Sequence, residues 1–565
     1  MPTVTIDDRT VEVAAGTNLI DAGLLVGVQI PHYCYHPRLT VVGQCRMCLV
    51  EIWDNGRKMP KPQAACSSAV TKEGWVVRTD TPEVHEAQRG MMEFFLINHP
   101  LDCPICDQAG ECALQDYAFK HGVAFSRFRF EDKRTYPGRE RIPLGSNVLL
   151  NMNRCIQCTR CVRFTHEVAK TGELGFFNRG ARVEIGTFPG KPLENHLSTC
   201  VVDICPVGAL TSTRFRFAER VFYLDKKPSL CTGCEVGCNI TVEHRRGKIK
   251  RYKPRFNPEV NDYWMCDYGR TTFERYAQMP RLQVPRNGGV TSGTIGWKEA
   301  LDQAARKLRS RSAEGAVAFL GSPFLTVEEA WLFAKLADAA GSPHRSVPVD
   351  RGPTWTIPNL KGGITGIEAA PNRRGAELAG LTPGTPAGES ASADVLNHDA
   401  LLAGDGAAQC SVLVVCDSDF GRAAWSPETV ERLRRARFLV VFGWADSPLA
   451  KVADLAFPVP THTEKEGTFV NVEHRLQRFA AAYPPPGQDR PLVDVLVDLL
   501  SRFDASWAQL PSPKTAAVFD KLAAEIPAFA GITWETIPAT GTSLHMPEAK
   551  ARLDTISAER VPERD

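Results

Sequence analysis

The chain has 565 residues, a length that predicts roughly three to five domains of 100–200 residues each. Its 67 Lys and Arg residues nearly balance 65 Asp and Glu residues, so the net charge of +2 excludes a global attraction to nucleic acid or an anionic membrane. No apolar run approaches the about 20 residues that span a bilayer, and the first residues lack the basic and apolar regions of a secretory signal. The composition therefore predicts a soluble multidomain protein in a cytoplasm-like compartment.

The first 80 residues predict a small, mostly β unit. Thr3–Val13 alternates apolar and polar residues around a turn, as a hairpin does, and Thr17 is expected to cap a short helix that ends at Leu25. Two later segments have the composition of further strands, Leu49–Trp53 and Trp75–Arg78.

A helix is predicted directly after this unit. Thr81 suits the N-cap and Pro82 the first helical position, and the apolar run that follows ends near Asn98–Pro100. This helix would deliver His99 beside Cys103.

From about residue 281 the pattern changes to apolar strands alternating with amphipathic helices. Ala316–Leu320 predicts a strand, and Thr326 with Glu329 forms a capping box that opens a helix reaching Ala340. Further strands, at Ser411–Cys416 and Phe438–Trp444, indicate a mostly parallel α/β sheet. Loops or linkers are predicted over Leu381–Asp394 and Tyr483–Arg490, and a poorly ordered tail from about residue 545.

Cysteine is concentrated in the first half, where 16 of the 18 residues of this type precede residue 267. Disulfides suit small secreted domains, whereas cysteines at two- and three-residue gaps in a large chain without an export signal indicate thiolate ligands of a metal. Four ligand sets are predicted: Cys34, Cys45, Cys48 and Cys66; His99, Cys103, Cys106 and Cys112; Cys155, Cys158, Cys161 and Cys205; and Cys231, Cys234, Cys238 and Cys266. The three remaining cysteines, Cys200, Cys410 and Cys416, are interpreted as buried apolar residues.

The spacings favour iron–sulfur clusters over zinc to different degrees. The first set has the order of a plant-type [2Fe–2S] loop with a longer first gap, and the third has the bacterial [4Fe–4S] pattern of three close cysteines and a remote Cys-Pro. The fourth set also suits [4Fe–4S]. The second set alone fits zinc as well as iron, and His99 could be an ordinary core or capping histidine.

Three arginines lie among the ligands of the third set: Arg154, Arg160 and Arg163. Their guanidinium groups could offset the negative charge of a thiolate-bound cluster and ease its reduction, or they could be ordinary solvated charges.

These ordered motifs resemble the large iron–sulfur subunit of respiratory complex I, called the G subunit or 75-kDa subunit. The resemblance rests on PHYCYHPRLTVVGQCRMCLVEI, HPLDCPICDQAGECALQD, NRCIQCTRCVRF with CPVGALT, and CTGCEVGC with Cys266. GWKEALDQAARKL and EGTFVNVEHRLQ resemble pieces of molybdopterin oxidoreductases more weakly.

The resemblance implies a multidomain α+β and α/β fold. We expect a β-grasp [2Fe–2S] domain over residues 1–80, a helical His(Cys)3 [4Fe–4S] domain over 81–125 and a ferredoxin-like [4Fe–4S] domain over 135–220. A [4Fe–4S] domain of the molybdopterin-enzyme type follows over 221–280, a degenerate molybdopterin-oxidoreductase-like α/β domain over 281–503 and a C-terminal extension over 504–565. No molybdopterin is expected, because the second half is short and offers no convincing molybdenum ligand.

The function implied is that of an electron-relay subunit in the peripheral arm of NADH:quinone oxidoreductase, at the cytoplasmic face of the bacterial inner membrane. It would carry one [2Fe–2S] and three [4Fe–4S] clusters, with the Cys231 cluster as a side branch. Partner subunits would bind NADH, FMN and quinone and drive ion translocation, and the membrane would be reached only through the complex. Gly404-Asp405-Gly406 lacks the context of a dinucleotide fingerprint.

Two alternatives remain open. A catalytic molybdoenzyme or soluble-hydrogenase subunit would share the first half, but such relatives usually carry two adjacent [4Fe–4S] clusters, and Thr165 stands here where a further ligand is expected. A structural zinc scaffold is the other alternative.

Overall fold

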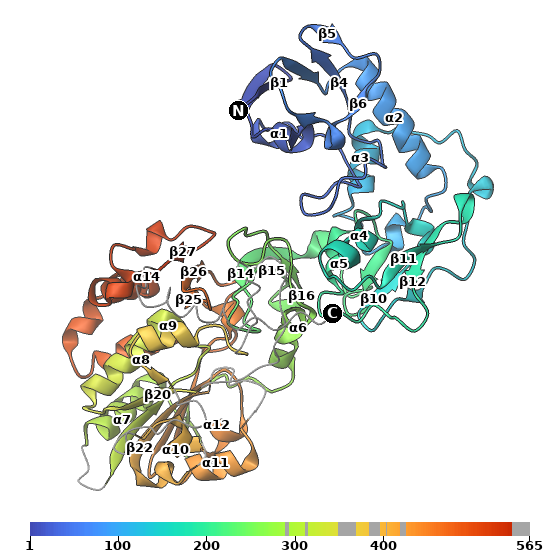
Figure 1. Cartoon of the computed structure of the whole chain (residues 1–565). Helices are drawn as coiled ribbons and strands as arrows, with labels where there is room; N and C mark the ends of the chain where they lie inside the picture. Colours follow the sequence, from blue (N-terminus) through green and yellow to red (C-terminus); the bar gives the residue numbers. More distant parts are fainter. Residues whose placement is uncertain are drawn as a thin grey trace, which may run out of the picture. The chain divides into compact units, whose positions relative to one another are not determined.

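The computed structural model describes residues 1–288, 293–310, 315–348, 369–383, 396–402, 404–417 and 425–544. The chain divides into two compact units, Met1–Leu224 and Asp225–Asp565, and Figure 1 shows the elements of each. Within the described residues, none of the helices combines the length and apolar character needed to span a bilayer.

The first unit begins with a mixed β-sheet that holds the first ligand set. Its strand order is β2-β1-β8-β4-β5, with β6 also paired to β4. The predicted hairpin is confirmed as β1 and β2, and Asp7 and Asp8 make its turn in the left-handed region, with φ of 46° and 67°. The strands are β1 Thr3–Ile6, β2 Arg9–Glu12, β4 Leu49–Asp54, β5 Arg57–Lys58, β6 Gln63–Ala64 and β8 Trp75–Arg78.

One predicted helix cap was wrong in this sheet domain. Helix α1, Leu19–Leu25, is capped by Asn18, whose side chain accepts hydrogen bonds from the backbone N–H groups of Ile20 and Asp21. Thr17 is instead part of strand β3, Thr17–Asn18, which pairs with β7, Ala69–Val70. Because the helix begins at Leu19, Asn18 occupies the cap position and Thr17 lies one residue too early.

Two helices follow the sheet, as the sequence predicts. Helix α2, Pro82–Leu96, is capped by the Thr81 side chain, which accepts a hydrogen bond from the backbone N–H of Val84. Helix α3, Ala113–His121, packs beside it. The segment between them carries the whole second ligand set.

The remainder of the first unit consists of short elements that surround the third ligand set. Strand β10 pairs with β13 and β9, β11 pairs with β12, and α4 packs against α5 and β11. The bounds are β9 Ile142–Pro143, β10 Val148–Leu150, α4 Arg160–Glu167, β11 Leu174–Phe177, β12 Glu184–Thr187, α5 Cys200–Ile204 and β13 Leu210–Ser212.

The second unit opens with a three-stranded antiparallel meander that carries the fourth ligand set. The order is β14-β15-β16, and the loop between β14 and β15 holds Cys231, Cys234 and Cys238. The bounds are β14 Asp225–Leu230, β15 Asn239–Arg245, β16 Lys248–Pro254 and α6 Asp267–Thr271.

The predicted mostly parallel sheet is confirmed in the second unit. It has the order β18-β17-β24-β23-β22-β19-β20-β21, in which the six strands from β24 to β21 run parallel. The bounds are β17 Arg286–Asn287, β18 Gly293–Thr294, β19 Ala316–Leu320, β20 His344–Val347, β21 Thr382–Pro383, β22 Cys410–Asp417, β23 Leu439–Gly443 and β24 Leu455–Pro458. Gly404-Asp405-Gly406 precedes β22 instead of following a strand, so no dinucleotide-type turn forms there.

Helices cover this sheet and share its apolar core. The predicted capping box is present at α8, where Thr326 and Glu329 bond reciprocally. Phe519 of α14 belongs to the same buried cluster as Phe333 of α8 and Leu496 of α13. The helices are α7 Trp297–Arg309, α8 Val327–Ala339, α9 Arg373–Leu378, α10 His398–Leu402, α11 Pro427–Leu433, α12 Pro448–Val452, α13 Leu492–Leu500 and α14 Lys514–Glu525, and a small antiparallel sheet adds β25 Gly467–Val470, β26 Arg475–Phe479 and β27 Thr542–Ser543.

The predicted linkers differ in outcome. Tyr483–Arg490 contains no helix or strand, as expected. Thr382 and Pro383 pair as the edge strand β21, so the linker prediction was wrong there, and the rest of Leu381–Asp394 and the tail from 545 lie outside the described residues.

One buried carboxyl group makes the stability of the second unit depend on pH. Glu328 is fully buried, and its Oε1 and Oε2 accept hydrogen bonds from the Thr468 hydroxyl (2.8 Å) and backbone N–H (3.1 Å). Burial raises the pKa of Glu328 from 4.5 to about 7. The folded state therefore binds a proton more tightly than the unfolded state, so stability is greatest below about pH 4.5 and falls as the pH rises to about 7.

Glu328→Gln should remove this dependence, because a neutral amide donates and accepts as the protonated acid does. We expect the loss of unfolding free energy between pH 5 and pH 8 to shrink by up to about 3 kcal/mol, measured by denaturant unfolding at both pH values. Glu299→Gln, at an exposed site in α7, is the control. If the unfolding free energy changed equally with pH in Glu328→Gln and Glu299→Gln, the assignment of this pH dependence to Glu328 would be wrong.

Candidate metal centres

The first set brings four buried thiols together in the sheet domain. Cys34 and Cys45 lie in loops, Cys48 directly precedes β4, and Cys66 lies in the turn η1 Ala65–Ser67. Hydrogen bonds from the Cys45 and Cys66 thiols lower the pKa of Cys34 to about 2, and the hydrogen bonds of Cys66 with Cys34 and Cys48 raise the pKa of Cys66. Four thiols linked in this way suit the ligands of a [2Fe–2S] core.

The second set lies on the segment between α2 and α3. Cys103 is exposed in the turn η2 Cys103–Ile105, Cys106 is buried, and Cys112 caps α3. Burial raises the pKa of Cys112 to about 11, with smaller contributions from the neighbouring Cys106 and Cys103. The three cysteines are thus close together, as expected for common ligands.

His99 follows the end of α2, where the sequence predicts it. Burial, together with the nearby positive charges of Arg154 and Lys133, lowers its pKa to about 4. The imidazole is therefore neutral at pH 7, the form that binds a metal. Its coordination together with the three cysteines stays a prediction.

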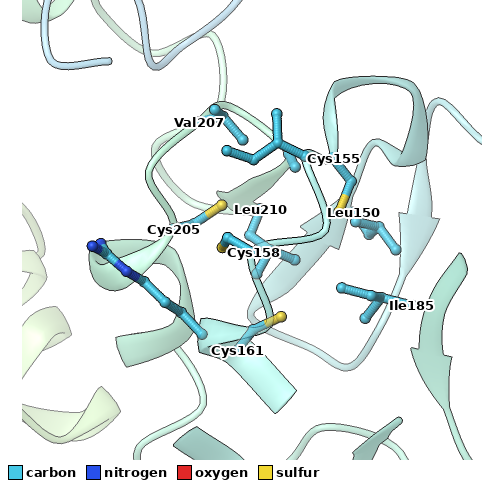
Figure 2. Close-up of a pocket in the computed structure, with 11 residues that line it drawn as sticks. Leu150, Cys155, Cys158, Cys161, Ile185, Cys205, Val207 and Leu210 are labelled. Atoms are coloured by element: carbon cyan, nitrogen blue, oxygen red, sulfur yellow. The ribbon is translucent and has the colours of Figure 1, made fainter. Parts of the chain in front are cut away.

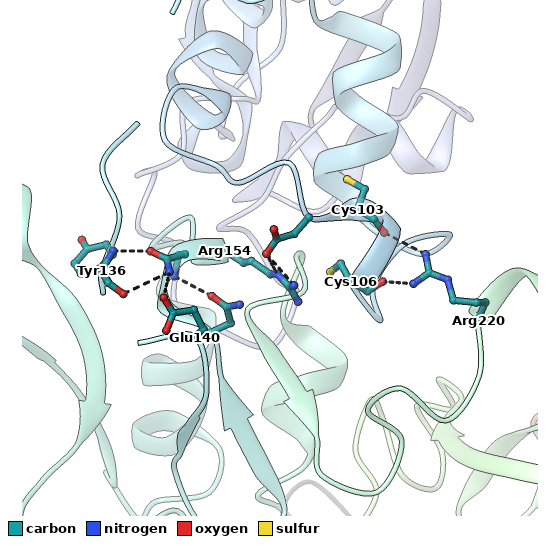
Figure 3. A network of polar contacts seen from close by, with 9 residues as sticks. Cys103, Cys106, Tyr136, Glu140, Arg154 and Arg220 are labelled. Carbon is teal, nitrogen blue, oxygen red and sulfur yellow. Dashed lines mark hydrogen bonds and ion pairs between the residues drawn. The ribbon is translucent and has the colours of Figure 1, made fainter. Parts of the chain in front are cut away.

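Polar contacts from distant segments hold this second set in place (Figure 3). Arg220 donates to the carbonyl oxygens of Cys106 and Cys103, both at 3.1 Å. Arg154 donates to the Asp102 carboxylate at 2.9 and 3.0 Å. Arg220 lies 114 residues from Cys106, and Arg154 lies 52 residues from Asp102. Sequence spacing could therefore not predict either contact.

The third set surrounds one pocket (Figure 2). The sulfur atoms of its four cysteines turn toward the same space, which is otherwise lined by Arg160 and by the aliphatic residues Leu150, Ile156, Ile185, Val207, Ala209 and Leu210. The chain wraps around Cys158 because its neighbours Gln157 and Thr159 have left-handed φ values of 55° and 68°. Burial raises the pKa of Cys205 to about 12 and the pKa of the other three thiols above their usual value.

The apolar lining and the four thiols of this pocket fit a [4Fe–4S] cluster. They do not fit a hydrophilic group that needs contact with water. Four buried thiolates without a counter-charge would have a high desolvation cost. Bound iron would replace the thiol protons and supply the counter-charge.

The fourth set is enclosed in the second unit. Cys231, Cys234 and Cys238 are buried, and Cys266 accepts a hydrogen bond from the backbone N–H of Gly269 at 3.3 Å. A Cβ atom at Gly269 would lie 2.9 Å from the Cys231 sulfur and 3.5 Å from the Cys266 sulfur. Glycine is therefore required where the two thiols approach each other, and nothing in the spacing predicts its role.

The third set lies next to both other sets of the first unit. A Cβ atom at Gly208 would lie 2.1 Å from the Cys106 sulfur, and Ala113 N–H donates to the Pro206 carbonyl at 3.2 Å. On the other side, Arg160 and Arg163 donate to backbone carbonyls of the Cys34 loop. The interpretation of Arg154 and Arg163 as solvated charges was wrong, because both side chains are buried.

The cysteines assigned to no set have the predicted burial. Cys200 is buried in α5, while Cys410 and Cys416 lie within β22 and its apolar clusters. Thr165 is buried and donates to the Val162 carbonyl at 2.9 Å. Within the described part of the chain, no three Cys, His, Asp or Glu side chains converge as ligands of a single ion do; a cluster instead binds its thiolates at separate iron atoms.

Five family models match the chain in the predicted order. They are a 2Fe–2S iron–sulfur cluster binding domain (residues 1–82), the NADH-ubiquinone oxidoreductase-G iron–sulfur binding region (88–127) and the NADH-quinone oxidoreductase subunit 3 ferredoxin-like domain (145–211). The molybdopterin oxidoreductase Fe4S4 domain (224–278) and molybdopterin oxidoreductase (378–502) follow.

Curated relatives agree with these models. The G subunit of NADH-quinone oxidoreductase from Streptomyces coelicolor is 42% identical over 60% of this chain and 39% of its own length. The corresponding protein of Rickettsia conorii is 40% identical over 60% of this chain and 50% of its own length. The chain thus spans half or less of the length of these relatives. A solved NAD+-reducing [NiFe]-hydrogenase chain is 30% identical, with a TM-score of 0.34, over 39% of this chain and 91% of its own.

The domains and the buried cysteine sets together define a multidomain iron–sulfur protein, with 2Fe–2S and 4Fe–4S binding domains in its first half. Over 60% of its length the chain is homologous to the G subunit of NADH-quinone oxidoreductase, and it carries the iron–sulfur domains of that family.

Four loaded ligand sets should give the full chain about 14 iron atoms and an equal number of acid-labile sulfides. Colorimetric iron and sulfide analysis after anaerobic reconstitution measures both. Half of that content would mean that at least one set is empty, and zinc without sulfide would favour the structural scaffold.

His99→Cys should lower the midpoint potential of the second centre, because an anionic thiolate would replace a neutral imidazole and stabilise the oxidised state. A redox titration followed by EPR measures the shift. His85→Cys, on the exposed face of α2, is the matched control. An unchanged potential in His99→Cys would exclude histidine ligation.

Proposed function

We propose that this chain is the iron–sulfur electron-relay subunit in the peripheral arm of an NADH:quinone oxidoreductase. The four ligand sets described above would hold one [2Fe–2S] and three [4Fe–4S] clusters, which supply one-electron oxidation and reduction when bound. The chain's own residues bury most of the thiols and, within the first unit, keep the first three sets next to one another.

The observation that carries this proposal is the packing of three ligand sets in one unit. The Cys155 set contacts the Cys34 loop through arginine side chains and the Cys106 thiol through Gly208. Redox centres held in adjacent, rigid positions suit transfer of electrons, whereas structural zinc sites need no such proximity.

The second unit is proposed as a scaffold without molybdopterin. Its two cysteines beyond the fourth set, Cys410 and Cys416, lie within strand β22 and pack in two separate apolar clusters, so they do not face one common cofactor site. Molybdenum in the purified chain, or formate oxidation by the chain alone, would contradict this part of the proposal and favour a molybdoenzyme.

Partner subunits are proposed to bind NADH and FMN, to carry the iron–sulfur path onward and to bind quinone, while the whole complex couples the reaction to ion translocation. The support is the similarity of this chain to relatives that are subunits of NADH-quinone oxidoreductase. The same support indicates a peripheral position at the cytoplasmic face of the bacterial inner membrane, with no direct membrane or nucleic-acid contact.

Cys158→Ser in the assembled complex should lower NADH:quinone activity at least tenfold and spare NADH:ferricyanide activity, because the artificial acceptor takes electrons before they reach this chain. Cys200→Ser, at a buried cysteine outside the ligand sets, is the control. Subunit content of the purified complex separates a blocked relay from failed assembly. Normal quinone reduction by an assembled Cys158→Ser complex would overturn the proposal.

A further inference from the structure

Helix α4 directs three polar side chains at the loop that carries Cys34. Arg160, Arg163 and Glu167 lie on one face of the helix, and the Glu167 carboxylate accepts a hydrogen bond from the Thr40 backbone N–H at 2.7 Å. The two arginines approach the same loop from the ligand segments of the third set. The contact therefore joins two different ligand sets within the first unit.

Arg163 makes the most complete of these contacts. Its Nη2 donates to the Cys34 carbonyl and, at 3.5 Å, to the Cys158 carbonyl, so one guanidinium group touches a ligand residue of each set. Its Nη1 donates to the Thr40 carbonyl, and its Nε donates to the Thr159 hydroxyl at 2.9 Å. The planar fork fixes all these oxygens at once, which a lysine could not do.

Arg160 makes a second connection in parallel. Its Nη2 donates to the Tyr35 carbonyl, next to Cys34, and its Nη1 donates to the Ile204 carbonyl at 3.1 Å, next to Cys205. Arg160 also lines the pocket of the third set. Hydrogen bonds of Arg160 and Arg163 therefore connect the Cys34 loop to the backbone at Cys158 and next to Cys205, two residues that line that pocket.

The charge of Arg163 is not explained by these hydrogen bonds alone. Its side chain is only 8% exposed, and a guanidinium group buried among neutral carbonyls pays a desolvation cost that carbonyl dipoles only partly offset. Three groups able to carry a negative charge interact electrostatically with it: the thiols of Cys158 and Cys34 and the carboxylate of Glu167. The two thiols belong to ligand residues whose backbone carbonyls Arg163 also contacts. Metal-bound thiolates stay anionic, so Arg163 has the position of a counter-charge common to both sets.

We infer that Arg163 is a positioning residue shared by the first and third centres. It links the Cys34 and Cys158 backbones in one hydrogen-bonded connection, and its positive charge stabilises the reduced state of both centres. This inference rests on the proposed function, since it takes the two ligand sets to hold redox clusters.

Three variants of the full chain, reconstituted anaerobically, test the inference. Arg163→Gln removes the charge, Arg163→Lys keeps the charge and removes the planar fork, and Arg179→Gln makes the same charge change at an exposed site in the same unit. Iron and sulfide content, EPR-monitored midpoint potentials and the spin relaxation of the [2Fe–2S] signal are measured for each.

The expected result differs between the variants. Arg163→Gln should shift the midpoint potentials of both centres to more negative values, whereas Arg179→Gln should shift neither. Arg163→Lys should keep both potentials near those of the unaltered chain and weaken the relaxation enhancement that the reduced third centre exerts on the [2Fe–2S] signal. Loss of both centres from Arg163→Gln, with the Cys231 centre retained, would also support a shared role.

Two results would overturn the inference. One is an Arg163→Gln chain with full iron content in which neither potential, or only one of them, changes. The other is an Arg163→Lys chain with unaltered relaxation, which would show that the fork does not connect the centres. Failure of the proposed function is distinguishable, because the unaltered chain would then lack iron, sulfide and both EPR signals.

Discussion

The constraint on which this structure depends is the burial of many thiols in apolar surroundings. Four cysteines around the pocket lined by Leu150 and Ile185 have raised pKa values, so as free groups they would remain protonated. A bound cluster converts them to thiolates and supplies the positive charge that offsets them. The chain is thus arranged around groups that are neutral when free and that a bound cluster would convert to buried thiolates with their charge offset.

The elements around each set serve this constraint in different ways. Turns with left-handed φ wrap the backbone around Cys158, and glycines at 208 and 269 leave room where sulfur atoms approach the backbone. Guanidinium groups then bond the carbonyls of the ligand loops, as Arg220 does for Cys103 and Cys106. These contacts hold the loops in place, and in the electron relay proposed above they would limit the rearrangement that accompanies a change of charge.

Local patterns predicted local structure well. The hairpin at Thr3, the cap at Thr81 and the capping box at Thr326 depend on neighbours in sequence, and each is present. The cap expected at Thr17 was wrong, because the helix begins one residue later and Asn18 takes the cap position. The burial of Glu328 against Thr468 was equally beyond sequence patterns, since it depends on how α8 meets β25.

The sequence by itself determined the kind and order of the iron–sulfur domains, which follow from cysteine spacing because ligands must be supplied by residues at particular short intervals. The four ligand sets within these domains remain its prediction. Tertiary structure alone decided which sets are neighbours and which charges lie between them. Arg163 and Cys34 are 129 residues apart, and no periodicity or spacing encodes a hydrogen bond formed only when two separately folded segments pack together.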